Sequence, residues 1–241
     1  MKDRTRLLIT LLLAGGVYYL SLYVIPHIGF IRALTENTVI SKGNIVQFMY
    51  LLFSLLLIYF VGEKKFAEYG FKLTKIKTVL WAVVISIPVE LVMIFVMIVA
   101  VVVSGGASPD ENLFTSMSFV ETVLSVWIVA STCEEIFFRG FLYGYLSPLK
   151  KYGLRVFGLF VSVPVSVCAV LFGLAHLCLL GRMPDAMVPV IVLSTTLLGF
   201  IAGYFREKSG SLVPAIAAHV TFNIVGYCVP QLLQMLAKGS A

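Results

Sequence analysis

The chain has 241 residues, of which 60% are hydrophobic and only 12% are charged. A water-soluble domain of this length carries about twice that charged fraction, so the composition argues against a soluble globular protein. The net charge of +6 raises the question of nucleic-acid binding, which depends on where the basic residues lie.

Long hydrophobic stretches account for most of the chain. Seven of them reach or approach the roughly 20 residues that a helix needs to cross a bilayer. In chain order they are residues 7–25, 44–62, 78–103, 118–146, 157–180, 186–205 and 211–236. Lipid leaves backbone N–H and C=O groups without partners unless they pair within a helix. The sequence therefore predicts an all-α polytopic transmembrane bundle, built as a single domain over residues 1–241.

The basic residues are distributed unevenly over the connecting loops. Thirteen of the eighteen fall on one side of the predicted membrane and four on the other, and Arg139 lies inside a span. Positive charge accumulates in cytoplasmic loops, so we predict a cytoplasmic N-terminus and an outer C-terminus. The basic residues orient the protein, and we expect membrane lipid rather than nucleic acid as its partner.

The fourth span carries three charged residues at bilayer depth. A charge there costs at least about 2.5–3.5 kcal/mol and marks a functional candidate. Glu135 and Arg139 are four residues apart, so they can pair on one helix face. Glu134 is rotated by about 100° from that face and has no such local partner, which leaves it available as a general base. An alternative is that the cluster only locks helices together.

Two further spans carry the remaining polar candidates. Phe172 and His176 share one face of the fifth span, and His219 and Asn223 share one face of the seventh. Interhelical hydrogen bonding explains each pair on its own. Together with Glu134, however, they supply a hydrolytic site: Glu134 and His176 can hold and deprotonate a water, while His219 and Asn223 can donate to an oxyanion.

These motifs resemble a known family. Glu134-Glu135-x-x-x-Arg139, Phe172-x-x-x-His176 and His219-x-x-x-Asn223 match, in order, the three signatures of the CAAX-protease and bacteriocin-processing (CPBP) family, which includes the type II CAAX prenyl endopeptidase. The resemblance covers a core of residues 118–228, and residues 1–117 form accessory spans without a motif. It implies seven to eight spans around a polar, water-accessible catalytic cavity.

The resemblance implies an intramembrane, glutamate-dependent endopeptidase that acts on membrane-associated proteins or peptides, prenylated CAAX-type substrates among them. Arg139 would orient Glu134 and Glu135, and Phe172 would support the site. No cofactor is favoured. A zinc site made by Glu134, His176 and His219 stays open as an alternative, although the H-E-x-x-H motif of standard zinc proteases is absent.

Other functions fit parts of the pattern. Buried Glu and His residues also mark ion pathways, so a transporter is one alternative. A non-enzymatic membrane partner, such as an immunity factor, is another. We expect a multi-pass protein of the plasma membrane in a prokaryote, or of the endoplasmic reticulum in a eukaryote. The sequence makes no prediction of the oligomeric state.

The depth of His176 tests the proposed site. At 1.5 Å per residue, Glu134 lies about 20 Å from the inner end of its span, near Pro148. His176 would lie about 30 Å from Arg155, which is too far out to meet Glu134. The sequence therefore predicts either that the fifth crossing starts near Pro164, with residues 150–161 as an interfacial helix, or that Pro164 kinks the span.

Overall fold

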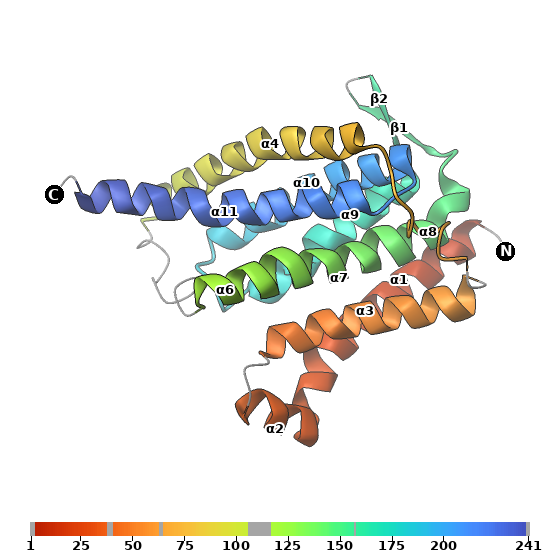
Figure 1. Cartoon of the computed structure of the whole chain (residues 1–241), viewed down its shortest axis with the longest axis horizontal. Coiled ribbons are helices and arrows are strands. Elements are labelled where there is room, and N and C mark those ends of the chain that lie inside the picture. Colours follow the sequence, from red (N-terminus) through yellow and green to blue (C-terminus); the bar gives the residue numbers. More distant parts are fainter. Residues whose placement is uncertain (1–2, 38–40, 63–64, 106–116, 157, 240–241) are drawn as a thin grey trace.

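A computed structural model describes residues 3–37, 41–62, 65–105, 117–156 and 158–239. Its long helices run side by side along one direction, and the two ends of the chain lie at opposite ends of the bundle (Figure 1). Five segments are long and apolar enough to cross a membrane: Asp3–His27, Lys42–Val61, Ile76–Val103, Met187–Ser209 and Val213–Leu236. This confirms the predicted all-α bundle, while the number of crossings stays a prediction.

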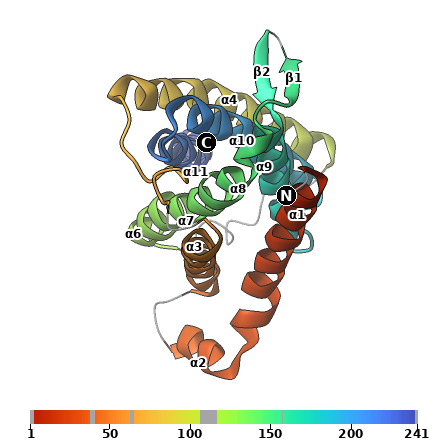
Figure 2. The ribbon, with the colours of Figure 1, turned by 90° about the vertical axis from the view of Figure 1, so that its right-hand side faces the viewer.

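The first, second and third of these segments precede the motifs. They contain α1 (Asp3–Tyr19) with the short η1 (Leu20–Val24) and η2 (Ile25–His27), then α3 (Lys42–Val61), then α4 (Ile76–Val103). The short α2 (Gly29–Asn37) lies between α1 and α3 in the sequence. Viewed along the bundle axis, α1, α2 and α3 lie together on one side of the other helices (Figure 2).

The glutamate motif lies in a helix that changes its winding along its length. It comprises α6 (Phe119–Glu121), η3 (Thr122–Ala130), α7 (Ser131–Glu135), η4 (Ile136–Leu142) and α8 (Tyr143–Leu146), followed by η5 (Ser147–Leu149). Both η3 and η4 are π-helical. Wider π turns inside α-helices occur frequently at functional sites, and here they flank the α-helical turn that carries Glu134 and Glu135.

The segment before the fifth span corrects one prediction. Residues 150–161 do not form an interfacial helix, because β1 (Gly153–Val156) and β2 (Leu159–Ser162) pair as an antiparallel hairpin. Short strands need only alternating apolar positions, and Gly158 supplies a positive φ of 81° at the turn. A helix over these residues would lose the pairing between the two strands and could not include the positive φ of Gly158.

The helix of the fifth predicted span starts near Pro164, as one of the two alternatives required, and Val163–Leu179 is a shorter apolar helix than the five candidate spans. Helix α9 (Val163–Ala175) begins there: the Ser162 hydroxyl accepts from the Val165 N–H, and Pro164 occupies the first turn. Thirteen residues span about 20 Å, so His176, which opens the short η6 (His176–Leu179), reaches the same depth as Glu134.

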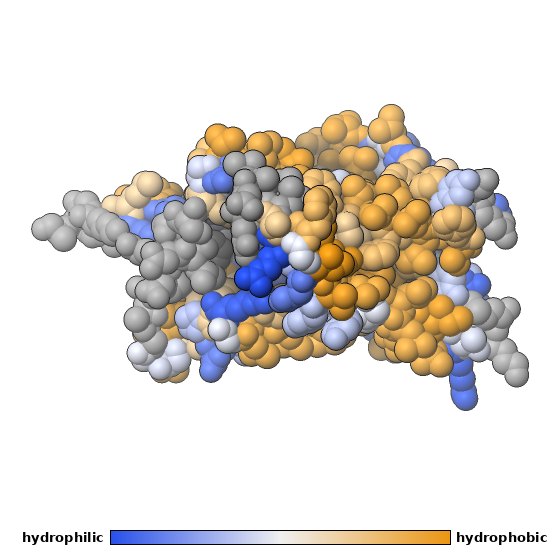
Figure 3. All heavy atoms as spheres, turned by 90° about the horizontal axis from the view of Figure 1, so that it is seen from below, coloured by the Kyte–Doolittle hydropathy of each residue, from blue (hydrophilic) through white to orange (hydrophobic). Residues whose placement is uncertain are grey.

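Helices α10 (Met187–Ser209) and α11 (Val213–Gly239) complete the bundle and pack with α4 and α9. The surface seen from below is mostly hydrophobic, with hydrophilic residues gathered in one patch and towards the ends (Figure 3). Exposed Leu, Val and Phe side chains along α3 and α4 are what a lipid-facing surface requires. The fold and surface therefore describe a membrane-embedded helical bundle.

Candidate active site

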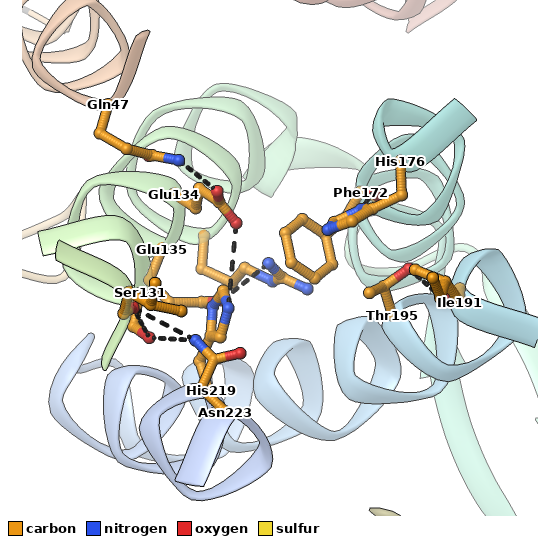
Figure 4. A network of polar contacts seen from close by, with 12 residues as sticks. Gln47, Ser131, Glu134, Glu135, Phe172, His176, Ile191, Thr195, His219 and Asn223 are labelled. Atoms are coloured by element: carbon orange, nitrogen blue, oxygen red, sulfur yellow. Dashed lines mark hydrogen bonds and ion pairs between the residues drawn. The ribbon is translucent and has the colours of Figure 1, made fainter. Parts of the chain in front are cut away.

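The structure brings the predicted site residues together from four parts of the chain. Glu134 and Glu135 come from α7, Phe172 from α9, His176 from the start of η6, and His219 and Asn223 from α11 (Figure 4). Arg139 comes from η4. Their side chains converge in the interior of the bundle, although the three motifs are separated by more than thirty residues each.

Glu135 is the centre of a buried ion network. Its Oε1 accepts from Arg139 Nη1 at 2.9 Å and from His219 Nδ1 at 3.0 Å. Glu135 and Arg139 are fully buried, and His219 is 5% exposed. The predicted pairing of Glu135 with Arg139 is therefore present. Because the carboxylate accepts from His219 Nδ1, that nitrogen carries a proton and Nε2 faces away from Glu135.

Glu134 has a different environment from its neighbour. Its Oε1 accepts from Gln47 Nε2 at 2.6 Å, and its Oε2 lies 3.8 Å from His219 Nε2. The side chain is 15% exposed, whereas that of Glu135 is fully buried. The two adjacent carboxylates therefore differ as expected: one is held in an ion pair, and the other keeps an oxygen available.

Gln47 is a site residue that the motifs did not reveal. It lies on α3, in a span that carries no family signature, and its own Oε1 is buried without a hydrogen-bond partner among the described residues. The signal that could have identified it is an amide inside an apolar span, since polar groups at bilayer depth are seldom retained without a use.

Phe172 and His176 are linked by their backbone and by their rings. His176 Nδ1 lies 3.0 Å from the Phe172 carbonyl oxygen, which can only accept, so Nδ1 carries the proton and Nε2 is the open acceptor of the neutral ring. The Phe172 ring contacts the rings of His176 and His219, with centroids 5.1 and 5.4 Å apart. Glu134 is close enough to His176 to interact electrostatically.

Phe172 also covers the guanidinium of Arg139. The Arg139 Cζ lies 4.5 Å from the centroid of the Phe172 ring, a distance at which a cation and an aromatic face attract. One ring thus contacts both imidazoles and the buried cation. Phe172 sets the spacing between α9 and α11 at the site.

Asn223 is held by a contact that the sequence did not suggest. Its Nδ2 donates to Ser131 Oγ at 2.9 Å and to the Val126 carbonyl at 3.3 Å. Ser131 lies one turn before Glu134 on the same helix, so the contact joins α11 to the glutamate-bearing element. To donate a hydrogen bond to an oxyanion, the Asn223 amide would have to break its bond to Ser131 Oγ and form one to the substrate.

Glu90, a partly buried carboxylate of α4, lies outside this network. Its Oε2 accepts from Ser194 Oγ at 2.8 Å, which joins α4 to α10.

The zinc alternative requires Glu134, His176 and His219 to share one focus. In the part of the chain that the structure describes, no three His, Cys, Asp or Glu side chains are grouped to hold a metal. His176 and His219 each keep Nε2 open, because Nδ1 is bonded to an oxygen acceptor. Zinc-bound imidazoles use the same arrangement, so the bonds at Nδ1 suit a zinc ligand as well as a metal-free role.

An apolar helical bundle with carboxylates, imidazoles and an amide at its centre defines an intramembrane hydrolase type of site. Comparison with protein families matches residues 116–225 to the family described as "Type II CAAX prenyl endopeptidase Rce1-like". This segment, 110 of the 241 residues, contains all three motifs and is similar to that family. Neither the curated proteins nor the solved structures gave a match.

Proposed function

We propose that the protein is a glutamate-dependent intramembrane endopeptidase that hydrolyses a peptide bond near the lipidated end of prenylated, CAAX-type proteins or peptides. The observation that supports this most is the environment of Glu134: a partly exposed carboxylate, anchored through one oxygen by Gln47, with its other oxygen facing His219. This environment supports a role for Glu134 Oε2 in activating the attacking water.

In the proposed reaction, a water binds between Glu134 Oε2 and His176 Nε2. Glu134 takes a proton from this water as the water attacks the scissile carbonyl, and later gives that proton to the leaving amine nitrogen. His176 is suited to hold the water, because the Phe172 carbonyl fixes the proton on Nδ1 and leaves Nε2 as an acceptor.

The oxyanion of the tetrahedral intermediate needs hydrogen-bond donors. His219 donates from Nε2 in its doubly protonated form, since Nδ1 is committed to Glu135. Asn223 donates a second bond after releasing Ser131. Arg139 takes no part in bond making. It pairs with Glu135 and holds it in place, and Glu135 in turn holds the His219 ring.

We propose that the reaction needs no metal. This is supported by the way the two imidazoles are used, because each is oriented by an oxygen acceptor on Nδ1 and presents one nitrogen to the site. A carbonyl or a carboxylate on Nδ1 is found both in histidines that act as general bases and in histidines that bind metals. Because Glu134, His176 and His219 are not grouped around one point, we favour the metal-free role.

The proposal is tested with the purified full-length protein in detergent and a fluorogenic peptide that ends in a farnesylated CAAX sequence. Wild type should cleave next to the prenylated cysteine, and Glu134→Gln, His176→Ala and His219→Ala should each lose at least 100-fold in kcat, in line with the loss of a general base or an oxyanion donor. Chelators should leave the rate unchanged.

Glu68→Gln is the matched control, since Glu68 is exposed on a loop and the substitution is chemically the same as Glu134→Gln. It should retain wild-type kcat. Cleavage that survives in all three site variants would refute the enzyme proposal. Uptake of ions into proteoliposomes without any cleavage would instead favour a transporter.

A further inference from the structure

The β1–β2 hairpin has one face made entirely of apolar residues. Residues directly opposite each other in an antiparallel pair share a face, and successive residues alternate between faces. The register places Leu154 opposite Val161 and Val156 opposite Leu159, so these four side chains project together. Arg155 belongs to the opposite face. We call the set of four the apolar hairpin face.

Among the residues that the structure describes, protein covers this face only at its base. Val161 packs against the hydrophobic core of the bundle, but Leu154 is 74% exposed, Leu159 56% and Val156 46%. The face therefore begins on the core and continues beyond it. A two-stranded hairpin is marginally stable on its own in water, so an uncovered apolar face of this kind calls for a hydrophobic cover.

The position of the hairpin indicates what covers it. The strands project sideways from the end of the bundle where the N-terminus lies, beyond the end of α4 (Figures 1 and 2). They do not continue the helices outward along the bundle axis. The hairpin thus lies to the side of the bundle, at the end where α1 begins.

Basic residues gather at the same place. Lys150 and Lys151 stand at the base of the hairpin and Arg155 on β1, and all three are exposed. Burial and the nearby Arg206 lower the pKa of Lys150, Glu207 raises it, and Lys72 lowers it further. The cations at this end of the bundle outnumber the single carboxylate of Glu207, which favours a further anion.

We propose that the apolar hairpin face lies in the interfacial layer of the adjacent membrane leaflet, and that Lys150, Lys151 and Arg155 contact the phosphate groups of anionic lipids there. An apolar face bordered by basic side chains is the combination that binds segments to an anionic bilayer surface. A second copy of the chain would have to bury the three cations against its own basic end, which disfavours that occupant.

The test uses full-length protein in nanodiscs of phosphatidylcholine and phosphatidylglycerol. Trp81→Phe and Trp127→Phe remove the native tryptophans, and a single tryptophan probe is introduced by Val156→Trp on the apolar hairpin face or by Phe160→Trp on the opposite face, where Phe160 pairs with Arg155. Lipids brominated on their acyl chains should quench the fluorescence of the residue 156 probe at least twofold more than that of the residue 160 probe. Aqueous acrylamide should show the reverse order.

The choice of lipid tests the basic residues. Bromination of phosphatidylglycerol alone should quench the residue 156 probe more than the same amount of brominated phosphatidylcholine, and Lys150→Gln with Lys151→Gln should remove that difference. Equal quenching at the two positions by both agents would place the face in water and overturn the proposal. If neither brominated lipid nor acrylamide quenches the residue 156 probe, protein covers the apolar hairpin face, and the proposal is overturned as well.

Discussion

Gln47 Nε2 donates a 2.6 Å hydrogen bond to Glu134 Oε1 across 87 residues of sequence. Glu134 lies within the segment that matches the CAAX endopeptidase family, whereas Gln47 lies on α3, well before it. The bond fixes one carboxylate oxygen and leaves the other facing His219. The accessory spans therefore contribute directly to the geometry of the site, and do more than enclose it.

Gln47→Leu should lower kcat by about 10- to 100-fold, since a hydrogen bond to a charged group is worth about 1.5–3 kcal/mol. The Michaelis constant should change little if Gln47 positions Glu134 and does not contact substrate. Steady-state kinetics on the prenylated peptide separates the two constants. Asn44→Leu is the control, one turn earlier on α3, and should retain wild-type kcat. An unchanged kcat for Gln47→Leu would show that Glu134 holds its position without the bond.

The buried pair of Glu135 and Arg139 should dominate the stability of the site. Removing one partner of a buried ion pair leaves an uncompensated charge and costs about 3–5 kcal/mol. We expect Glu135→Gln or Arg139→Met to lower the unfolding temperature in detergent strongly.

The double variant Glu135→Gln/Arg139→Met should lose less stability than the sum of the single changes, because neither charge is then left alone. Thermal unfolding of all four proteins completes the cycle. Strictly additive losses would mean that the two groups are not coupled, contrary to the 2.9 Å contact between them.

The long spans and the three motifs could be predicted because each depends on local spacing. A run of about 20 apolar residues indicates a crossing, and the four-residue spacing of Glu135 and Arg139 places both on one helix face whatever the rest of the fold does. The start of the fifth predicted span near Pro164 could also be predicted, because His176 can meet Glu134 only if both lie at the same depth in the membrane.

The hairpin and the partners of Glu134 and Asn223 could not be predicted in the same way. Strands of four residues with apolar alternation resemble the start of a hydrophobic span, so Leu154 to Val161 carried no distinct signal. Gln47 and Ser131 become site residues only through the packing of α3 and α11 against α7. Local sequence does not encode that packing.

Asn223 and Ser131 provide a test of the oxyanion assignment. Asn223→Leu should reduce kcat by about 10²–10³-fold, the usual effect of removing one oxyanion donor, with a small change in the Michaelis constant. Ser131→Ala should keep kcat within a few-fold of wild type, because Asn223 exchanges that bond for one to substrate. A loss in Ser131→Ala equal to that in Asn223→Leu would instead show that the bond between them matters, and would count against direct contact of Asn223 with substrate.

The close approach of α9 to α10 should control where His176 sits. A Cβ on Gly199 would come within 2.7 Å of Ala169 Cα, so Gly199→Ala forces the two helices apart. Overpacking of this kind costs about 1–3 kcal/mol, and because α9 carries Phe172 and His176, kcat should fall along with the unfolding temperature.

Gly15→Ala is the matched control, because a Cβ there meets nothing within 4 Å. It should leave kcat unchanged and stabilise α1 by about 0.5–1 kcal/mol, the usual gain over glycine inside a helix. Unfolding in detergent and cleavage of the prenylated peptide measure both effects. Wild-type kcat in Gly199→Ala would mean that the bundle absorbs the displacement without moving His176, and that the site tolerates a looser α9 than the contact with Ala169 suggests.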